Sequence, residues 1–245
     1  LSVSLGNLVT NPSGPDVTFR ILKPDGSVYA NTDTAAASVF NLPNLPVAGT
    51  YTVIVSPDYG LPASFQVSLL SQVGGVLTVD GASQSVTAAV GGQNAYLTFA
   101  AATGDDLEIG LSDLTVNGST CLAANVYDAA NSNVGNAYWS TSNPGASARM
   151  SLWNLAGGTY TVVLSGCSGT TAFSGTVTLT RDLTGTLTVG GSQSIDLSRP
   201  GQTERLSFAG TAGQTLAVAL ENPVTTPSGK NITFKVMKPD GTQYA

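Results

Sequence analysis

Histidine is absent from this chain of 245 residues, and charged residues make up only 10% of it. Nine Lys and Arg residues stand against 15 Asp and Glu residues, which gives a formal net charge of −6. Because histidine is the commonest acid–base residue and metal ligand, its absence excludes a Ser–His–Asp triad of the usual form. The shortage of basic residues argues against nucleic-acid binding, which needs a positively charged surface. The composition therefore favours a non-catalytic protein that binds no nucleic acid.

Long apolar runs and helical periodicity are lacking as well. No hydrophobic stretch approaches the length of about 18 residues that crosses a bilayer, so we expect no membrane-spanning segment. Instead, 28 Gly and 12 Pro residues separate short segments in which every second residue is apolar. This alternation is typical of β-strands joined by tight turns, and it predicts an all-β chain. The clearest segments are 1–5, 17–21, 51–55, 65–69, 160–164 and 232–236.

Cysteine occurs only twice, at Cys121 and Cys167. The 46-residue separation does not fit a CxxC redox or zinc motif. One pair of cysteines in an all-β chain of low charge favours a structural disulfide and an oxidising compartment. The alternative is a pair of reduced, buried thiols that do not meet.

The sequence repeats itself internally. The segment "VAGTYTVIV" (47–55) matches "AGGTYTVVL" (156–164), and "GGQNAYLTFAAATGDDLEIGL" (91–111) matches "PGQTERLSFAGTAGQTLAVAL" (200–220), both at an offset of 109 residues. Near the amino terminus the offset is 106, because "LSVSL" matches the segment that begins at Leu107. A unit of about 107 residues has the size of one β-sandwich domain, so we predict tandem antiparallel modules of the Ig-like or jelly-roll-like kind.

The repeats alternate in kind. Residues 216–245 align with residues 1–30 without a gap and are identical at 17 of 30 positions, whereas the middle copy has "DAANSN" where both have "KPDG". The order is therefore A-B-A, and we interpret the chain as a segment of a longer array.

Two turn-rich segments, "LSQVGG" (70–75) and "TRDLTG" (180–185), are the best candidates for linkers. They predict the carboxy-terminal part of one module at 1–73, a complete module at 74–182, and the amino-terminal part of the next at 183–245.

The order of these segments resembles the pre-peptidase C-terminal domains of secreted bacterial proteins. The resemblance is carried by "GQTERLSFAGTAGQTLAVAL", "KPDG" and "LPVAGTYTVIV", and as repeats it covers nearly the whole chain. It implies a β-sandwich with a non-catalytic role in a secreted or cell-surface bacterial protein. Some members bind calcium through an acidic cluster near the start of the module, and that cluster is not clearly matched here.

Asp105, Asp106 and Glu108 form the densest group of carboxylates in the chain. Calcium takes six to eight oxygen ligands, so these residues are weak candidates for a calcium site. The next repeat has Gln214, Thr215 and Ala217 at these positions, which favours a solvated loop instead.

Trp139 is the candidate for contact with a ligand. It replaces Ala30 of the first copy, and an exposed Trp beside Asn and Ser could stack on a sugar ring. Packing inside a module or between modules is the alternative.

Two functions of different classes fit these observations. The first is a structural module of an extracellular filament, fibre or stalk, whose partners are copies of itself or further repeats of the same chain. Half-modules would then be completed by another copy, as in strand donation, or by covalent continuation of the array. The second is an adhesin or carbohydrate-binding module, in which the variable segments 31–37, 129–147 and 166–171 share one face with Trp139.

Overall fold

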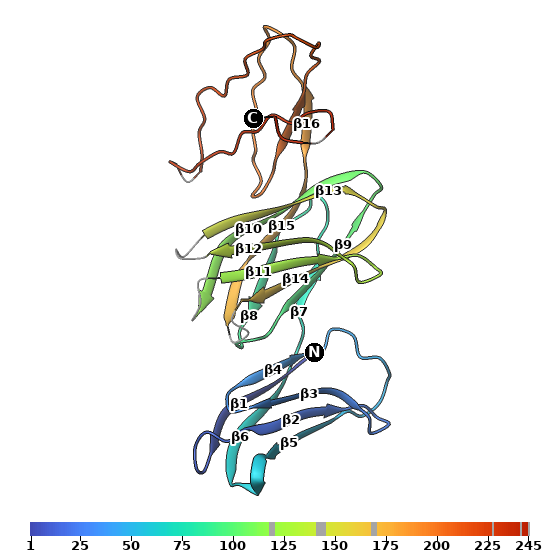
Figure 1. The fold of residues 1–245 in the computed structure, drawn as a ribbon, viewed down its shortest axis with the longest axis vertical. Helices are drawn as coiled ribbons and strands as arrows, with labels where there is room; N and C mark the ends of the chain where they lie inside the picture. Colours follow the sequence, from blue (N-terminus) through green and yellow to red (C-terminus); the bar gives the residue numbers. More distant parts are fainter. Residues whose placement is uncertain (118–120, 141–145, 168–170, 227, 241, 245) are drawn as a thin grey trace. The chain divides into compact units, whose positions relative to one another are not determined.

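The computed structural model describes residues 1–117, 121–140, 146–167, 171–226, 228–240 and 242–244 (Figure 1). Its regular structure is strand throughout these residues, apart from one 3₁₀ turn at Asp58–Gly60, so the predicted all-β class is confirmed. The described residues form no helix long and apolar enough to cross a membrane. By their internal contacts, residues 1–187 and 191–207 make one unit, and residues 188–190 and 208–245 make another.

Six strands build an N-terminal sandwich, drawn in blue to cyan in Figure 1. One sheet has the order β4-β1-β6 and the other has the order β3-β2-β5, with antiparallel pairing throughout. Alternate residues of β2 are buried, as the apolar alternation predicted, and side chains from both sheets meet in one core. The strands are β1 (Ser2–Thr10), β2 (Val17–Leu22), β3 (Val28–Thr34), β4 (Ser38–Asn41), β5 (Thr52–Pro57) and β6 (Ala63–Leu70).

Nine strands build a central sandwich. Its sheets have the orders β13-β10-β15-β8 and β12-β11-β14-β9-β7, and a second core lies between them. Fully burying a side chain such as Phe99 or Leu164 contributes about 1.5–3 kcal/mol. The strands are β7 (Val73–Val76), β8 (Gln84–Ala88), β9 (Ala95–Ala101), β10 (Asp105–Asn117), β11 (Cys121–Tyr127), β12 (Asn133–Ser140), β13 (Ala146–Leu155), β14 (Gly158–Gly166) and β15 (Ala172–Arg181).

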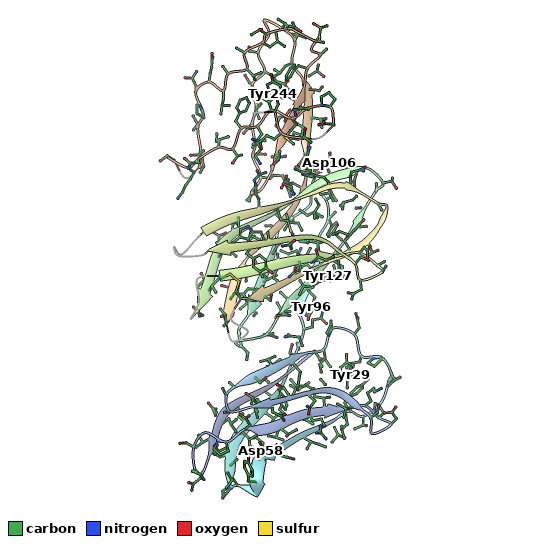
Figure 2. All side chains as sticks on the ribbon, in the orientation of Figure 1. Tyr29, Asp58, Tyr96, Asp106, Tyr127 and Tyr244 are labelled. Atoms are coloured by element: carbon green, nitrogen blue, oxygen red, sulfur yellow. A yellow bond between two sulfur atoms is a disulfide. The ribbon has the colours of Figure 1, made fainter. Side chains whose placement is uncertain are left out.

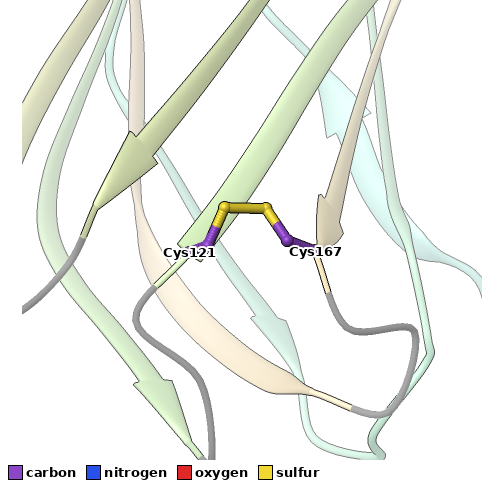
Figure 3. Close-up of a disulfide and its surroundings, with 2 residues drawn as sticks. All are labelled: Cys121 and Cys167. Atoms are coloured by element: carbon purple, nitrogen blue, oxygen red, sulfur yellow. A yellow bond between two sulfur atoms is a disulfide. The ribbon is translucent and has the colours of Figure 1, made fainter.

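The disulfide predicted from the cysteine count is present and joins Cys121 to Cys167 (Figure 3). Cys121 begins β11, and Cys167 directly follows β14, which is paired with β11. The bond therefore ties the ends of two neighbouring strands in the five-stranded sheet of the central sandwich.

Beyond the central sandwich, β16 (Leu183–Thr186) pairs in parallel with β17 (Glu204–Ser207). The second unit forms no strand of its own among its described residues, and its one isolated bridge joins Met237 to Gln243. That bridge flanks the second "KPDG" turn, where the amide of Thr242 donates to the Asp240 carboxylate. In the N-terminal sandwich the amide of Ser27 makes the same bond to Asp25.

Candidate functional site: the two junctions of the central sandwich

The first junction is made by the side-chain amide of Asn41 at the end of β4. Its Nδ2 donates to the carbonyl oxygen of Gly92 at 2.8 Å, and its Oδ1 accepts from the backbone amide of Asn94 at 2.9 Å. Oδ1 also accepts from the hydroxyl of Ser2, which lies opposite Asn41 in the β1–β4 register. Asn41 thus holds the loop that precedes β9 of the central sandwich.

The second junction uses the equivalent positions. The 106-residue offset relates Ser2 to Glu108, and "SVFNL" (38–42) matches "ARMSL" (148–152), which relates Asn41 to Ser151. Glu108 and Ser151 lie opposite each other in the β10–β13 register, and the Ser151 hydroxyl donates to Glu108 Oε1 at 2.6 Å. The same carboxylate oxygen accepts from the hydroxyl of Thr203 at 3.1 Å. Thr203 is the equivalent of Asn94, so in both junctions the contacted residue has the same position in the following loop.

Backbone packing at the second junction is close. A Cβ added to Gly110 would lie 2.1 Å from the carbonyl oxygen of Pro200, and one added to Gly201 would lie 2.6 Å from the Cα of Gly110. Gly201 also has a φ of +82°, which glycine adopts without strain. A side chain at Gly110 would therefore push the loop at 200–201 away from β10.

Charged side chains surround this packing. Arg205 of β17 forms an ion pair with Asp182, lies 3.7 Å from Asp106, and places its guanidinium 4.9 Å from the ring centroid of Trp153. Arg149 approaches Glu108 at 3.6 Å, and its guanidinium also donates to Thr203 at 2.8 Å. Hydrogen bonds, an ion pair with a buried carboxylate and a cation–π contact therefore all attach residues 203–205 to the central sandwich.

Burial raises the pKa of Glu108 above its ordinary value, because the side chain is withdrawn from water on β10. The hydrogen bond from Ser151 and the charge of Arg149 act in the opposite direction. Within the described residues, Oε2 of Glu108 accepts no hydrogen bond, and the same holds for Oδ1 of Asp182. The second junction therefore contains two carboxylates that are only partly satisfied.

The three candidate calcium ligands lie on strand β10, where the sequence had favoured a solvated loop. That expectation is wrong for Asp105 and Glu108, which are both buried. Asp105 forms an ion pair with Arg181, and the hydrogen bond from that guanidinium lowers the pKa of its carboxyl. The carboxylate of Asp106 accepts from the backbone amide of Asn154. No group of three or more potential metal ligands occurs among the residues that the structure describes, so a calcium role for these residues stays a prediction.

Trp139 lies on β12, and its side chain is partly buried against the core of the central sandwich. Trp153 on β13 is 57% exposed and carries the contact with Arg205. Of the variable segments grouped with Trp139 in the binding hypothesis, residues 141–145 and 168–170 lie outside the described part of the chain. Ligand contact by Trp139 therefore stays a prediction.

Asn41, Ser151 and Thr203 were missed in the sequence. The repeat offsets could have found them, because they relate Ser2 and Asn41 to Glu108 and Ser151. In each copy the two residues lie opposite each other in the strand register. A pair of opposed polar residues at the same end of two sheets indicates a shared contact.

No protein-family model matches the sequence, and a search of curated proteins finds no match. Among solved structures, the chain is similar to the pre-peptidase C-terminal domain of a collagenase from Bacillus anthracis, with a TM-score of 0.32 and 10% identity over 46% of this chain and 99% of that one. It is also similar to PliG of Aeromonas hydrophila, a periplasmic inhibitor of g-type lysozyme, with a TM-score of 0.24 and 15% identity over 43% of this chain and 98% of that one.

A third similarity is to the structure of infectious bursal disease virus, Gx strain, with a TM-score of 0.21 and 14% identity over 73% of this chain and 55% of that one. The first of the three is a domain of the kind that the sequence motifs resemble. All three TM-scores are low, so these similarities add nothing to what the arrangement of strands already shows.

Proposed function

We propose that this chain is a structural, non-catalytic module of an extracellular filament, fibre or stalk built from tandem β-sandwich repeats. The observation that carries the proposal is the similarity of two contacts. In the first junction Asn41, which accepts a hydrogen bond from Ser2, binds the loop before β9. In the second junction Glu108, which accepts a hydrogen bond from Ser151, binds Thr203 in the loop before β17. Contacts from matched pairs of residues to matched loops are what an array of similar modules requires.

The linkers support the same proposal. β6 ends at Leu70 and β7 begins at Val73, while β15 ends at Arg181 and β16 begins at Leu183. The single intervening residue of the second linker, Asp182, is buried, and its carboxylate is paired with Arg205. Linkers this short, fixed by buried contacts, restrict bending between modules, whereas a flexible tether needs a longer and more polar segment.

The disulfide supports an extracellular location, and an extracellular location fits the filament role. Bonds such as Cys121–Cys167 persist in oxidising compartments and are rare in the cytosol. The low content of charged residues also lets neighbouring modules pack with little cost of desolvating charge.

Electron microscopy of the native material tests this proposal. We expect unbranched fibres with a beaded axial repeat in which modules alternate in pairs, as the A-B-A order requires. Dispersed single particles, or threads without an axial repeat, would overturn the filament role.

The alternative proposal is an adhesin or carbohydrate-binding module. It is favoured by the exposed indole of Trp153 on β13. Titrating Trp139→Phe and Trp153→Phe variants with polysaccharides, while following the fluorescence of the remaining Trp, separates the two rings. A saturable change in either variant would support binding, and no change in both would reject it.

A further inference from the structure

The outer face of the five-stranded sheet in the central sandwich carries tyrosine and asparagine side chains. Alternate residues of a strand point to opposite faces of its sheet, and Leu97, Ala124 and Val162 point into the core. The residues between them therefore lie on the outer face. Six of these define what we call the tyrosine face: Tyr96 on β9, Tyr127 and Asn125 on β11, and Asn133, Asn136 and Tyr138 on β12.

The strand registers place these side chains across four neighbouring strands. Asn125 lies opposite Val163 of β14, and Val163 lies opposite Tyr96 of β9. Tyr127 follows two residues later on β11, and Tyr138 lies on β12, the strand at the other side of β11. With about 4.8 Å between strands and about 3.3 Å per residue, the three tyrosines span about 15 Å. That length suits a chain of several sugar units better than a single small molecule.

Solvent reaches this face. Tyr138 is 67% exposed, and the two asparagines of β12 are exposed as well. Tyr96 and Tyr127 are partly buried. Burial raises the pKa of the Tyr96 phenol, a hydrogen bond with Asn94 lowers it, and the phenol of Tyr127 raises it. The two phenols, both labelled in Figure 2, are therefore close enough to influence each other.

The tyrosine face has hydrogen-bonding groups to spare. Within the described residues, the side chains of Tyr127, Asn136 and Tyr138 form no hydrogen bond. The Nδ2 of Asn133 donates to the Oδ1 of Asn125 at 3.3 Å. Amide groups supply both donors and acceptors, and tyrosine supplies a rigid ring together with a hydroxyl. This combination suits a ligand that has many hydroxyl groups and flat apolar surfaces between them.

The matched face of the N-terminal sandwich is charged. In the strand registers, Arg20 has the position of Asn125, and Asp33 has the position of Tyr138. Both of these charged side chains are hydrogen-bonded to the neighbouring strand. Among the described residues of the central sandwich, the five strands place no Asp, Glu, Lys or Arg on the outer face. The neutral face is therefore a property of the central, B-type module.

Neither tryptophan belongs to the tyrosine face. Trp139 packs against the core, and in the strand registers it corresponds to Thr34, whereas the sequence offset had related it to Ala30. Trp153 lies on β13 of the other sheet. A ligand on the tyrosine face would therefore touch residues that the binding hypothesis from the sequence did not include.

We propose that the tyrosine face binds an uncharged polysaccharide, which lies across β12, β11, β14 and β9 with its sugar rings on the tyrosines and its hydroxyls on the asparagine amides. Charge argues for this occupant, because the face offers no cation to an anionic polymer and the net charge of −6 repels one. A protein partner would need a large apolar side chain at the centre of the contact, and the described part of this face presents no Leu, Ile, Phe, Met or Trp. The inference is independent of the filament role, and it gives the alternative proposal a site of its own.

Native gel electrophoresis in the presence of dissolved hydroxyethylcellulose, glucomannan or dextran tests the proposal. At least one of these neutral polymers should retard the parent, whereas the anionic polymer alginate should not. Tyr127→Ala and Tyr138→Ala should each weaken binding on the order of 10-fold, because each removes one stacking ring. Tyr59→Ala is the matched control, since Tyr59 is 91% exposed but lies in the N-terminal sandwich, and it should bind like the parent.

Two further measurements separate ring stacking from a loss of folding. Tyr127→Phe and Tyr138→Phe keep the ring and should keep most of the affinity, while Tyr138→Asp introduces the charge that the N-terminal sandwich carries and should abolish binding. Circular dichroism checks that each variant is folded. In the parent itself, a retarding polymer should protect Tyr127 and Tyr138 from nitration by tetranitromethane and leave Tyr59 reactive, as read by mass spectrometry.

A parent that none of the neutral polymers retards overturns the proposal, and so does retardation by alginate alone. Retardation that Tyr127→Ala and Tyr138→Ala leave unchanged also overturns it. If Trp153→Phe weakens binding in that case, the chain binds carbohydrate at another site. The filament role is decided separately by electron microscopy, because fibres form or fail to form whatever the tyrosine face binds.

Discussion

Replacing Glu108 with Gln removes a buried charge from the second junction while preserving its shape. The parent carboxylate accepts hydrogen bonds from Ser151 and Thr203 at one oxygen, and its other oxygen accepts none from the described residues. Withdrawing a carboxylate from water costs several kcal/mol, and hydrogen bonds to a charged acceptor return about 1.5–3 kcal/mol each. Burial raises the pKa of Glu108, so the folded chain favours the neutral form of this carboxyl more than the unfolded chain does. We expect Glu108→Gln to raise the free energy of unfolding at pH 7 by about 1 kcal/mol.

The sign of the pH dependence follows from the same shift. The pKa of Glu108 in the folded chain lies above its ordinary value of 4.5, so the folded state binds the proton more tightly than the unfolded state. Its stabilising contribution is complete below the unfolded pKa and is lost as pH rises through the folded pKa, with a slope of at most about 1.4 kcal/mol per pH unit. Asp105 has the opposite sign, because Arg181 lowers its pKa and its contribution is lost as pH falls. Asp105 contributes equally to both proteins, so its contribution cancels when the free energy of unfolding of the parent is subtracted from that of the variant.

Urea unfolding between about pH 4 and pH 7.5, followed by the fluorescence of Trp153, measures this difference, since that indole packs against Arg205 at the junction. The advantage of Glu108→Gln over the parent should be largest at pH 7 and vanish near pH 4. Glu221→Gln, at an exposed position, is the control variant and is unfolded over the same pH range. A constant difference across the pH range would refute the assignment of the buried charge to the second junction.

Three further changes test the structure at other points. Replacing both Cys121 and Cys167 with Ser should lower the free energy of unfolding by about 4 kcal/mol, and a reductant should then have no further effect on the urea midpoint. Asn41→Ala leaves two backbone groups of the first junction without their partner, so it should cost about 2 kcal/mol and speed hydrogen exchange in the loop before β9. Gly110→Ala should cost about 1–3 kcal/mol and expose the second linker to proteases, whereas Gly158→Ala, whose added Cβ would meet nothing within 4 Å, should do neither.

The fold class could be predicted because the alternation of apolar residues is a local signal. Val17, Phe19 and Ile21 point to one face of β2 in any sheet that strand joins, and all three are buried. The disulfide was predictable for a different reason, since a chain with two cysteines permits only one pairing. Neither inference needed knowledge of which strands are neighbours.

The candidate site depends on which strands are neighbours, and the expectation that its carboxylates lie in a solvated loop was wrong for two of them. Asp105 and Glu108 follow a Gly-containing turn, where carboxylates are usually solvated, yet the long strand β10 begins at Asp105 and carries both of them into buried positions. What buries them comes from elsewhere in the chain: Arg181 from β15 pairs with Asp105, and Thr203 from the following loop binds Glu108. Contacts over 76 and 95 residues leave no local pattern.

The two junctions differ in chemistry at matched positions, and this difference gives the proposed filament a testable periodicity. Ser2 and Asn41 make a neutral junction, Glu108 and Ser151 make a charged one, and the third repeat has Ala217 at the position of Ser2 and Glu108. In an A-B-A array, neutral and charged junctions therefore alternate. Because burial raises the pKa of Glu108, a rise in pH weakens every second junction, so limited proteolysis of native fibres should increasingly release two-module fragments of about 215 residues as pH rises. Lowering the pH favours the neutral carboxyl and removes the preference. A ladder of single modules at every pH would contradict this account and would mean that the buried carboxylate does not set the strength of the junction.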